Sequence, residues 1–144
     1  MSESQPITSE YFMKRLVDLC LRSGLSGFPK NDVDQHILLK SAAVTLGQPG
    51  SFTEKELNEK LEFWVKHIGQ IKNIDRITLR RGLVDTGYLT RNKDGSSYQV
   101  AQPGPRAVLF DGAIDHMDIL EVLTTAREEM ARKKREYLDK SRGH

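Results

Sequence analysis

Four basic side chains have the type and spacing needed to bind the phosphates of a nucleic acid. Arg76 and Arg81 fall in a predicted helix, and Arg91 and Lys93 fall in the predicted strand and turn after it. Lysine and arginine neutralise phosphates and release counterions, which supplies much of the affinity for DNA. We therefore take these four residues as the candidate nucleic-acid site. Cations on a hairpin are also typical of ordinary solvated surface, so both interpretations of Arg91 and Lys93 stay open.

Arg80 has a different predicted role from its neighbour Arg81. At about 100° per residue, Arg80 falls between two apolar flanks of the helix, whereas Arg81 points outward. A buried guanidinium must be paired, because burial of an uncompensated charge is costly. The candidate partners are carboxylates of the preceding helix, Glu56, Glu59 and Glu62, and we expect a structural ion pair with Glu56. A phosphate contact is the alternative for Arg80.

The surroundings of Arg81 are not basic. Asp75 and Asp85 lie on the same side of the helix, so two negative charges accompany one positive charge. Such a face is poorly suited to the phosphate-lined grooves of DNA. Gly82 lies on this side as well, where glycine costs about 1 kcal/mol relative to alanine. Either another helix or a partner approaches the backbone at Gly82, or the glycine is simply tolerated.

The residue types used by enzymes and metal sites are present but not grouped. The four histidines do not pair at metal-ligand spacing. Asp111, Asp115, His116 and Asp118 are close in sequence, and the dipole at a helix start explains such acidic residues without a metal. Cys20 lies on an apolar stripe, where a packed thiol is the default. We expect no catalytic residue, no metal and no cofactor.

Composition indicates a globular protein with long exposed helices. Of the 144 residues, 38% are apolar and 29% are charged, which suits one domain with helical extensions. The net charge is +2, too balanced to indicate nucleic-acid binding by itself. No run of about 18 apolar residues could span a membrane. A single cysteine, and a first segment without the layout of a signal peptide, lead us to expect a cytoplasmic protein.

Capping residues and glycines predict where four helices begin and where three of them end. The predicted starts are at Thr8 or Ser9, at Asn31 or Asp32, at Thr53, and at Asp75. The predicted stops are at Gly24, Gly47 and Gly87. The sharpest signal is "FTEKEL", in which Thr53 and Glu56 form a capping box and Phe52 and Leu57 a hydrophobic staple. This third helix is expected to fray in "VKHIGQIKN".

The second half of the chain predicts a hairpin and one long helix. "YLTR", "NKDG" and "SSYQV" are typical of strand, turn and strand, with Asp94-Gly95 in the turn. "QPGPR" indicates a linker, and a helix is expected from Ile114 to Lys140. The predicted division is an N-terminal helix over 1–24, a main domain over 25–102, a linker over 103–113 and a C-terminal helix over 114–144.

Three helices followed by a two-stranded wing is the order of a winged helix-turn-helix. "GFPK", "FTEKELNEKL" and "LRRGLVDTGYLTRNKDGSSY" resemble the bacterial family called domain of unknown function twenty eighty-seven, over roughly Leu25 to Gln102. The resemblance implies a winged-helix-like fold and a bacterial source. Members are sometimes joined to regulator domains, but the family has no established activity. The chain departs from the pattern at Gly82, where an aromatic residue is usual, and between His67 and Asn73, where the connection is longer.

The C-terminal helix suggests assembly. A helix of about 25 residues is roughly 38 Å long, more than a core of this size needs. Its apolar stripe consists of Met117, Leu120, Leu123, Met130 and Tyr137. The helix either packs across the first helix or pairs with a second chain. We expect a homodimer through the terminal helices.

The sequence thus predicts a mainly α protein with a small β-hairpin wing, a winged helix-turn-helix flanked by N- and C-terminal helices. The expected function is a DNA-binding transcriptional regulator, with double-stranded DNA as partner. The alternative is a non-catalytic protein-interaction module that keeps the fold but has lost DNA binding. A continuous basic strip through the four candidate residues would favour DNA, and a neutral face with an apolar rim would favour a protein partner.

Overall fold

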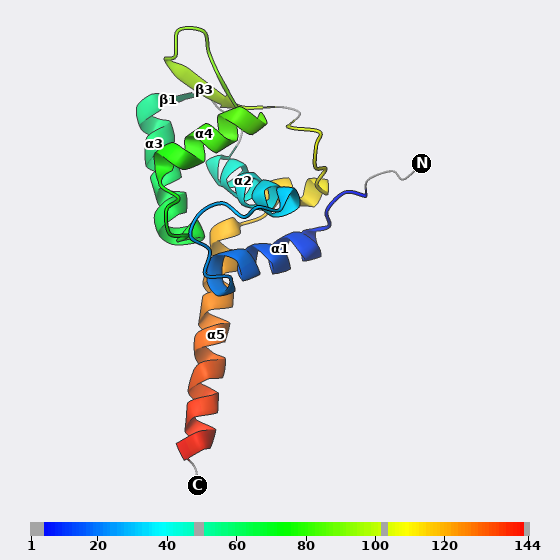
Figure 1. Ribbon diagram of the computed structural model, residues 1–144, viewed down its shortest axis with the longest axis vertical. Helices are drawn as coiled ribbons and strands as arrows, with labels where there is room; N and C mark the ends of the chain where they lie inside the picture. Colours follow the sequence, from blue (N-terminus) through cyan, green and yellow to red (C-terminus); the bar gives the residue numbers. More distant parts are fainter. Residues whose placement is uncertain (1–4, 48–50, 102–103, 143–144) are drawn as a thin grey trace.

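The computed structural model describes residues 5–47, 51–101 and 104–142. Within these ranges the protein is mainly helical and carries one small antiparallel sheet (Figure 1). The α-helices are α1 (Ser9–Val17), α2 (Asp32–Leu46), α3 (Glu54–Trp64), α4 (Arg76–Thr86) and α5 (Ile119–Arg142). Short turns of wider or tighter helix are η1 (Asp18–Arg22), η2 (Val65–Gly69) and η3 (Gly112–His116). The strands are β1 (Ser51–Thr53), β2 (Leu89–Arg91) and β3 (Ser97–Val100).

Helix α2 lies at the centre of the fold and is buried on more than one side. Ile37, Leu38 and Leu39 are consecutive in sequence and all buried, so they point in different directions around the helix axis. Helices α1, α3, α4 and α5 each pack against α2. In Figure 1, α1 lies below α2 and α4 lies above it. The core is therefore arranged around one central helix.

The sheet has three strands in the order β1-β3-β2, and both pairings are antiparallel. Phe52 of β1 and Arg91 of β2 both lie opposite Tyr98 of β3, one on each side. The sequence predicts the β2–β3 hairpin but not β1. Three residues directly before a helix cap give no periodic signal, and β1 forms because β3, more than forty residues away, supplies its hydrogen-bond partners.

The predicted helix starts are confirmed at the residues that cap them. In α1, α2, α3 and α4, one backbone N–H of the first turn donates to the side chain of the cap, which is Thr8, Asn31, Thr53 and Asp75, respectively. Residues Thr53 and Glu56 form the complete capping box, with bonds of 2.9 and 3.1 Å. At the other end, Gly87 adopts the left-handed conformation that closes α4.

Helix α3 ends in the wider turn η2, whose last residue, Gly69, packs against the indole of Trp64. The indole of Trp64 is buried and donates a hydrogen bond of 2.9 Å to Ser41 Oγ of α2. A Cβ atom on Gly69 would lie under 3.0 Å from three atoms of this indole. The ring thus occupies the space that any larger residue at position 69 would need. After Gly69 the chain turns at Gln70, which has a φ of 46°.

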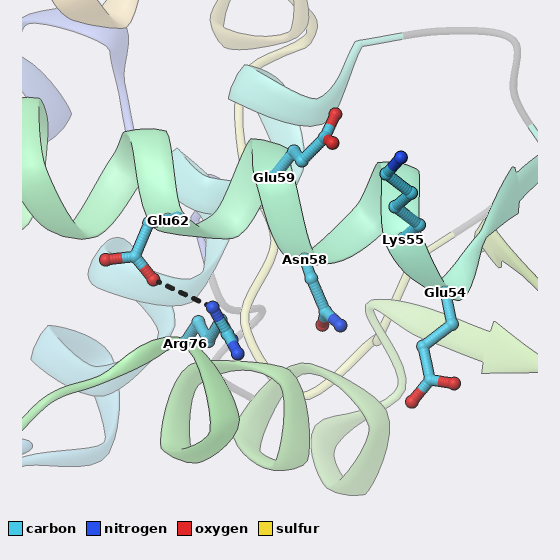
Figure 2. A pocket seen from close by; sticks show the side chains of 6 residues that line it. All are labelled: Glu54, Lys55, Asn58, Glu59, Glu62 and Arg76. Atoms are coloured by element: carbon cyan, nitrogen blue, oxygen red, sulfur yellow. Dashed lines mark ion pairs between the residues drawn. The ribbon is translucent and has the colours of Figure 1, made fainter.

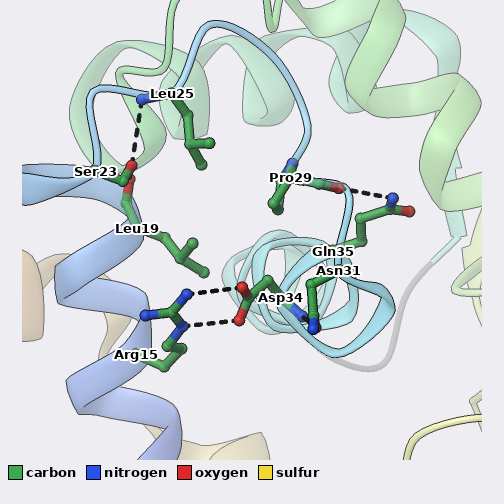
Figure 3. Close-up of polar contacts among 8 residues, drawn as sticks. All are labelled: Arg15, Leu19, Ser23, Leu25, Pro29, Asn31, Asp34 and Gln35. Carbon is green, nitrogen blue, oxygen red and sulfur yellow. Dashed lines mark hydrogen bonds and ion pairs between the residues drawn. The ribbon is translucent and has the colours of Figure 1, made fainter.

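A bidentate ion pair joins α1 to α2. The guanidinium of Arg15 donates two hydrogen bonds of 2.8 Å to the carboxylate of Asp34, which is buried (Figure 3). Two charge-assisted bonds in a planar pair fix both distance and orientation. The loop between the helices is also held, because Gln35 donates to the Pro29 carbonyl at 2.7 Å. The N-terminal helix is therefore a fixed part of the fold.

The segment predicted as a linker over 103–113 is tied to the N-terminal segment where the structure describes it. The backbone N–H of Ile7 donates to the Leu109 carbonyl, and that of Asp111 donates to the Ile7 carbonyl, at 2.8 and 2.9 Å. Phe110 packs edge-on against Phe12 of α1 with ring centroids 5.9 Å apart. Residues 102 and 103, at the predicted domain boundary, lie outside the described residues.

The C-terminal α-helix begins at Ile119 instead of the predicted Ile114. Ile114 belongs to the tighter helix η3, and Met117 is extended. Asp118 then accepts from the Glu121 N–H at 3.0 Å, which makes it the cap of α5. The far part of α5 extends well beyond the rest of the molecule (Figure 1). None of the helices in the described ranges is long and apolar enough to cross a membrane.

Candidate functional site

The candidate site lies where α3 and α4 face each other below the hairpin. On α3, Glu54, Asn58 and Glu62 recur every four residues and so share one face of the helix. On α4, Arg76 and Arg80 have the same spacing. The two rows run antiparallel, so the early turn of α3 meets the later turn of α4. The site is thus a short ladder of acidic and amide groups opposite two arginines.

Arg80 occupies the upper rung of this ladder. Its guanidinium donates to Glu54 Oε1 at 3.1 Å and to Asn58 Oδ1 at 3.0 Å, and it lies 5.9 Å from the centre of the Tyr98 ring. The Arg80 side chain is 24% exposed, whereas that of Glu54 is 56% exposed. Arg80 is therefore half-buried between helix and hairpin, as its place between apolar flanks predicts, but its carboxylate partner stays in water.

The predicted partner of Arg80, Glu56, is replaced by Glu54 for a geometric reason. Glu56 is about 200° around α3 from Glu54, so the two carboxylates cannot share the face toward α4. Glu56 accepts from the Thr53 N–H instead, and this bond lowers the pKa of its carboxyl group. The capping-box role of Glu56 therefore holds it at the start of α3, away from Arg80.

Arg76 occupies the lower rung. Its Nη1 lies 3.5 Å from Glu62 Oε2, and its side chain is 48% exposed. An open hollow of about 560 Å³ lies beside this pair (Figure 2). The residues lining the hollow are Glu54, Lys55, Asn58, Glu59, Glu62 and Arg76. Its wall is thus mostly α3, and three carboxylates outnumber two cations.

Arg81 is exposed on the outer side of α4, as the sequence predicts, but Gly82 is not. A Cβ atom on Gly82 would lie 3.3 Å from Leu39 Cδ2 of α2 and 3.6 Å from Phe28 Cζ. Of the explanations open for this glycine, close approach of another helix is the one observed. Gly82 therefore serves the packing of α4 onto α2.

One of the two hairpin cations, Arg91, packs against a side chain of the hairpin. The guanidinium of Arg91 lies 5.8 Å from the centre of the Tyr98 ring, directly across the strand pair. Lys93 is exposed in the turn, beside Asp94. The Asp94 carboxylate accepts from the hydroxyl and backbone N–H of Ser96, and these bonds lower the pKa of Asp94. Asp94 is therefore a charged part of the turn beside both cations.

The structure does not gather the four candidate residues into a continuous basic strip. Arg76 faces a carboxylate, Arg81 is exposed, and Arg91 and Lys93 are on the hairpin. Five basic and five acidic residues belong to the ladder, the outer side of α4 and the turn. They are Arg76, Arg80, Arg81, Arg91 and Lys93, against Glu54, Glu62, Asp75, Asp85 and Asp94. The face as a whole is electrically balanced.

Exposed apolar side chains flank the ladder at its lower end. Ile77 follows Arg76 and is 52% exposed, and Phe63 follows Glu62 and is 39% exposed. Phe63 also stacks on His67, with ring centroids 4.8 Å apart. An apolar residue beside each member of one ion pair gives this part of the face a mixed polar and apolar character.

Three titratable groups away from the α3–α4 face, His36, Tyr88 and Cys20, are packed into the fold. His36 Nδ1 and the Tyr88 hydroxyl share a hydrogen bond of 2.7 Å, and burial lowers the pKa of His36. Burial also raises the pKa of the Cys20 thiol to about 12. In the described ranges, no three His, Cys, Asp or Glu side chains are grouped closely enough to hold a metal ion.

Comparison with known proteins places this mainly helical domain with its three-stranded sheet in a bacterial class. The family described as "Uncharacterized protein conserved in bacteria (DUF2087)" matches residues 24–100, which is more than half of the chain, and the chain belongs to that family. The match extends from before α2 to the end of β3 and leaves α1 and α5 outside. No curated protein and no solved structure matches the chain.

The sequence interpretation missed Glu54 and Asn58 as partners of Arg80. It considered Glu62 as a candidate for Arg80, whereas Glu62 pairs with Arg76. A signal for all three was present, because Thr53 fixes the start of α3 and the three residues then fall within about 80° of each other. The missing information was which face of α3 turns toward α4. That orientation follows from the burial of Leu57, Leu61 and Trp64 in the core.

Proposed function

We propose that this chain is a winged helix-turn-helix protein that acts as a non-catalytic interaction module and binds a protein partner at its α3–α4 face. The order α2, β1, α3, α4, β2, β3 with the sheet order β1-β3-β2 supports the winged-helix assignment. In that assignment α4 takes the place of the recognition helix and the β2–β3 hairpin is the wing.

The observation that carries the proposal is the pairing of both inward arginines of α4. Arg76 faces Glu62 and Arg80 is bonded to Glu54, so two cations that a DNA groove would need are already neutralised. A recognition helix binds in a groove of DNA, and carboxylates on the adjacent helix repel the DNA phosphates. The same ladder, with its hollow and apolar flanks, suits a partner that mixes charged and apolar side chains.

The chemistry of the hollow indicates the kind of partner. Glu59 lines the hollow together with Glu54 and Glu62. Ile77 follows the lining residue Arg76 in the sequence and is an exposed apolar side chain of α4. We propose a protein segment that places a lysine or arginine in the hollow and an apolar side chain against Ile77. The expected homodimer through the terminal helices belongs to the same proposal.

DNA binding is the second candidate function. Arg81, Arg91 and Lys93 are exposed cations on α4 and on the β2–β3 hairpin. Contacts from these positions would reach phosphates without reading bases. A regulator with this surface would bind DNA through three phosphate contacts at most per chain.

Site-specific photo-crosslinking in the native host tests the protein-partner proposal. A crosslinking amino acid at Ile77 should give a discrete product that resists nuclease and disappears when Glu59→Arg is added. The matched control is the same amino acid at Leu109, an exposed apolar residue of the segment that pairs with Ile7. A nuclease-sensitive product, or the same product from both positions, would contradict the proposal.

A further inference from the structure

The first half of α5 contacts the end of another helix through one arginine. Arg127 Nη1 donates to the His67 carbonyl at 2.8 Å, and Arg127 Nη2 donates to the Ile68 carbonyl at 3.2 Å. Both carbonyls belong to η2, which continues α3 and packs against α5. In Figure 1 the lower end of α3 lies beside the upper part of α5. A single half-buried side chain of α5 therefore binds two carbonyls of η2.

The carbonyls at the end of a helix need donors from outside the helix. They have no partner within it, and they carry the negative end of the helix dipole. In η2 the Val65 carbonyl accepts from the Gln70 backbone N–H at 3.1 Å, and the Lys66 carbonyl accepts from the Gln70 side-chain amide at 2.7 Å. Arg127 donates to the next two carbonyls, and its positive charge suits the dipole. The cap of this helix thus comes partly from α5, sixty residues farther along the chain.

The capped turn carries the lower end of the α3–α4 face. Phe63 stacks on the ring of His67, with centroids 4.8 Å apart, and the carbonyl of the same His67 accepts from Arg127. Glu62, one residue before Phe63, pairs with Arg76 at 3.5 Å. Helix ends fray from the last turn inward, so this turn is the part of α3 that depends on the cap. The upper rung lies at the other end of α3.

We infer that Arg127 is a positioning residue of the α3–α4 face and that α5, acting through η2, keeps the lower rung and Phe63 ordered. The inference rests on the proposed function and names an element that regulates the same face. A partner that meets an ordered turn avoids the free-energy cost of ordering it on binding, which raises affinity. Because α5 lies outside the part that matches the family, this control comes from outside the family domain.

Amide hydrogen exchange of the purified whole chain tests the first step without a partner. Arg127→Gln should speed exchange at the Gln70 N–H, which is bonded to the Val65 carbonyl, by about tenfold or more. The Tyr88 N–H, bonded to the Leu83 carbonyl at 2.8 Å, should speed up by less than about threefold. Equal acceleration at both amides would mean that Arg127 only stabilises the whole fold, and this result would overturn the inference.

Two further variants control the exchange experiment. Arg132→Gln is the matched control, because Arg132 is 53% exposed on the same helix and pairs with Glu136 of that helix at 2.8 Å. This variant should leave both amides at their wild-type rates. Arg127→Lys keeps a cation beside the carbonyls but has one donor group in place of the guanidinium. It replaces Arg127→Gln where that variant does not fold, and Gln70 should again exchange faster while Tyr88 changes little.

Photo-crosslinking measures the consequence for binding. With the crosslinking amino acid at Ile77, Arg127→Gln should lower the yield of the nuclease-resistant product by about threefold or more, whereas Arg132→Gln should leave it unchanged. Absence of that product from the wild type would overturn the proposed function and the inference with it. A wild type that gives the product, with an unchanged yield in Arg127→Gln or an equal loss in Arg132→Gln, would overturn the inference alone.

Discussion

At the scale of single residues, one contact packs the end of α3 against η2 and another joins α3 to α4. Gly69 leaves room for the indole of Trp64, which is buried and bonded to Ser41. Arg80 takes Glu54 because Glu56 is committed to the start of its own helix. The first contact depends on the absence of a Cβ atom at Gly69, and the second depends on which face of α3 turns toward α4. Neither Gly69 nor Glu54 is at a position that hydrophobic periodicity alone would identify.

Gly69→Ala should destabilise the protein by about 1–3 kcal/mol, the usual range for overpacking in a core. The added Cβ would lie under 3.0 Å from three atoms of the Trp64 ring, and that ring is held by its neighbours. Urea unfolding measures the change. Gly112→Ala is the matched control, because a Cβ there meets no atom within 4 Å and should change stability by less than about 0.5 kcal/mol. Equal midpoints for both variants would show that Trp64 can move aside.

At the scale of elements, most helix starts and the hairpin could be predicted, because local rules decide them. Thr8, Asn31, Thr53 and Asp75 each cap a helix through a side-chain oxygen within three residues of the N–H that it accepts. Three features needed information from distant residues. Strand β1 requires β3, the ladder requires the orientation of α3, and the tie between the linker and Ile7 requires the folded core.

The start of α5 was missed for a local reason. The acidic residues Asp111, Asp115 and Asp118 lie close together in the sequence, so it offers several possible caps. Asp111 caps η3 and Asp118 caps α5, and the extended backbone of Met117 separates the two. A pattern that shows only periodicity merges these two helices into one.

The contact between α2 and the start of the hairpin should make stability depend on pH. Burial lowers the pKa of His36, which shares a hydrogen bond with Tyr88, while the charge of Asp32 acts in the opposite direction. In the unfolded chain the pKa of His36 returns to about 6.5. Between these two pKa values the unfolded chain binds more protons, so stability should fall as the pH drops below about 6.5.

The measurement is the urea midpoint at pH 7.5 and at pH 5.5. His36→Gln should lose less stability between the two values than the wild type, because glutamine does not titrate. His116→Gln is the control, since His116 is exposed on η3 and the variant should show the wild-type fall. If His36→Gln and the wild type fall equally, the buried imidazole is not the source of the pH dependence.

At the scale of the whole molecule, the proposed partner face and the proposed dimer contact lie on different parts of the chain. The part that matches the DUF2087 family carries the α3–α4 face, the hollow and the β2–β3 hairpin. Helices α1 and α5 lie outside that match, and the far part of α5 extends beyond the other elements. The proposed partner face and the proposed dimer contact therefore use separate surfaces. A dimer built through α5 would leave both α3–α4 faces open and would present two of them to a partner.

The claim that the ladder neutralises α4 is tested most directly by a titration of labelled duplex DNA with the wild-type protein at several salt concentrations. We expect no binding stronger than about 10⁻⁴ M at low salt, which is weaker than ordinary non-specific association. The contradicting result is tight binding whose log–log salt dependence flattens by about 2 in Arg91→Ala with Lys93→Ala, one phosphate for each cation removed. That outcome would show that the β2–β3 hairpin binds DNA despite the paired arginines of α4.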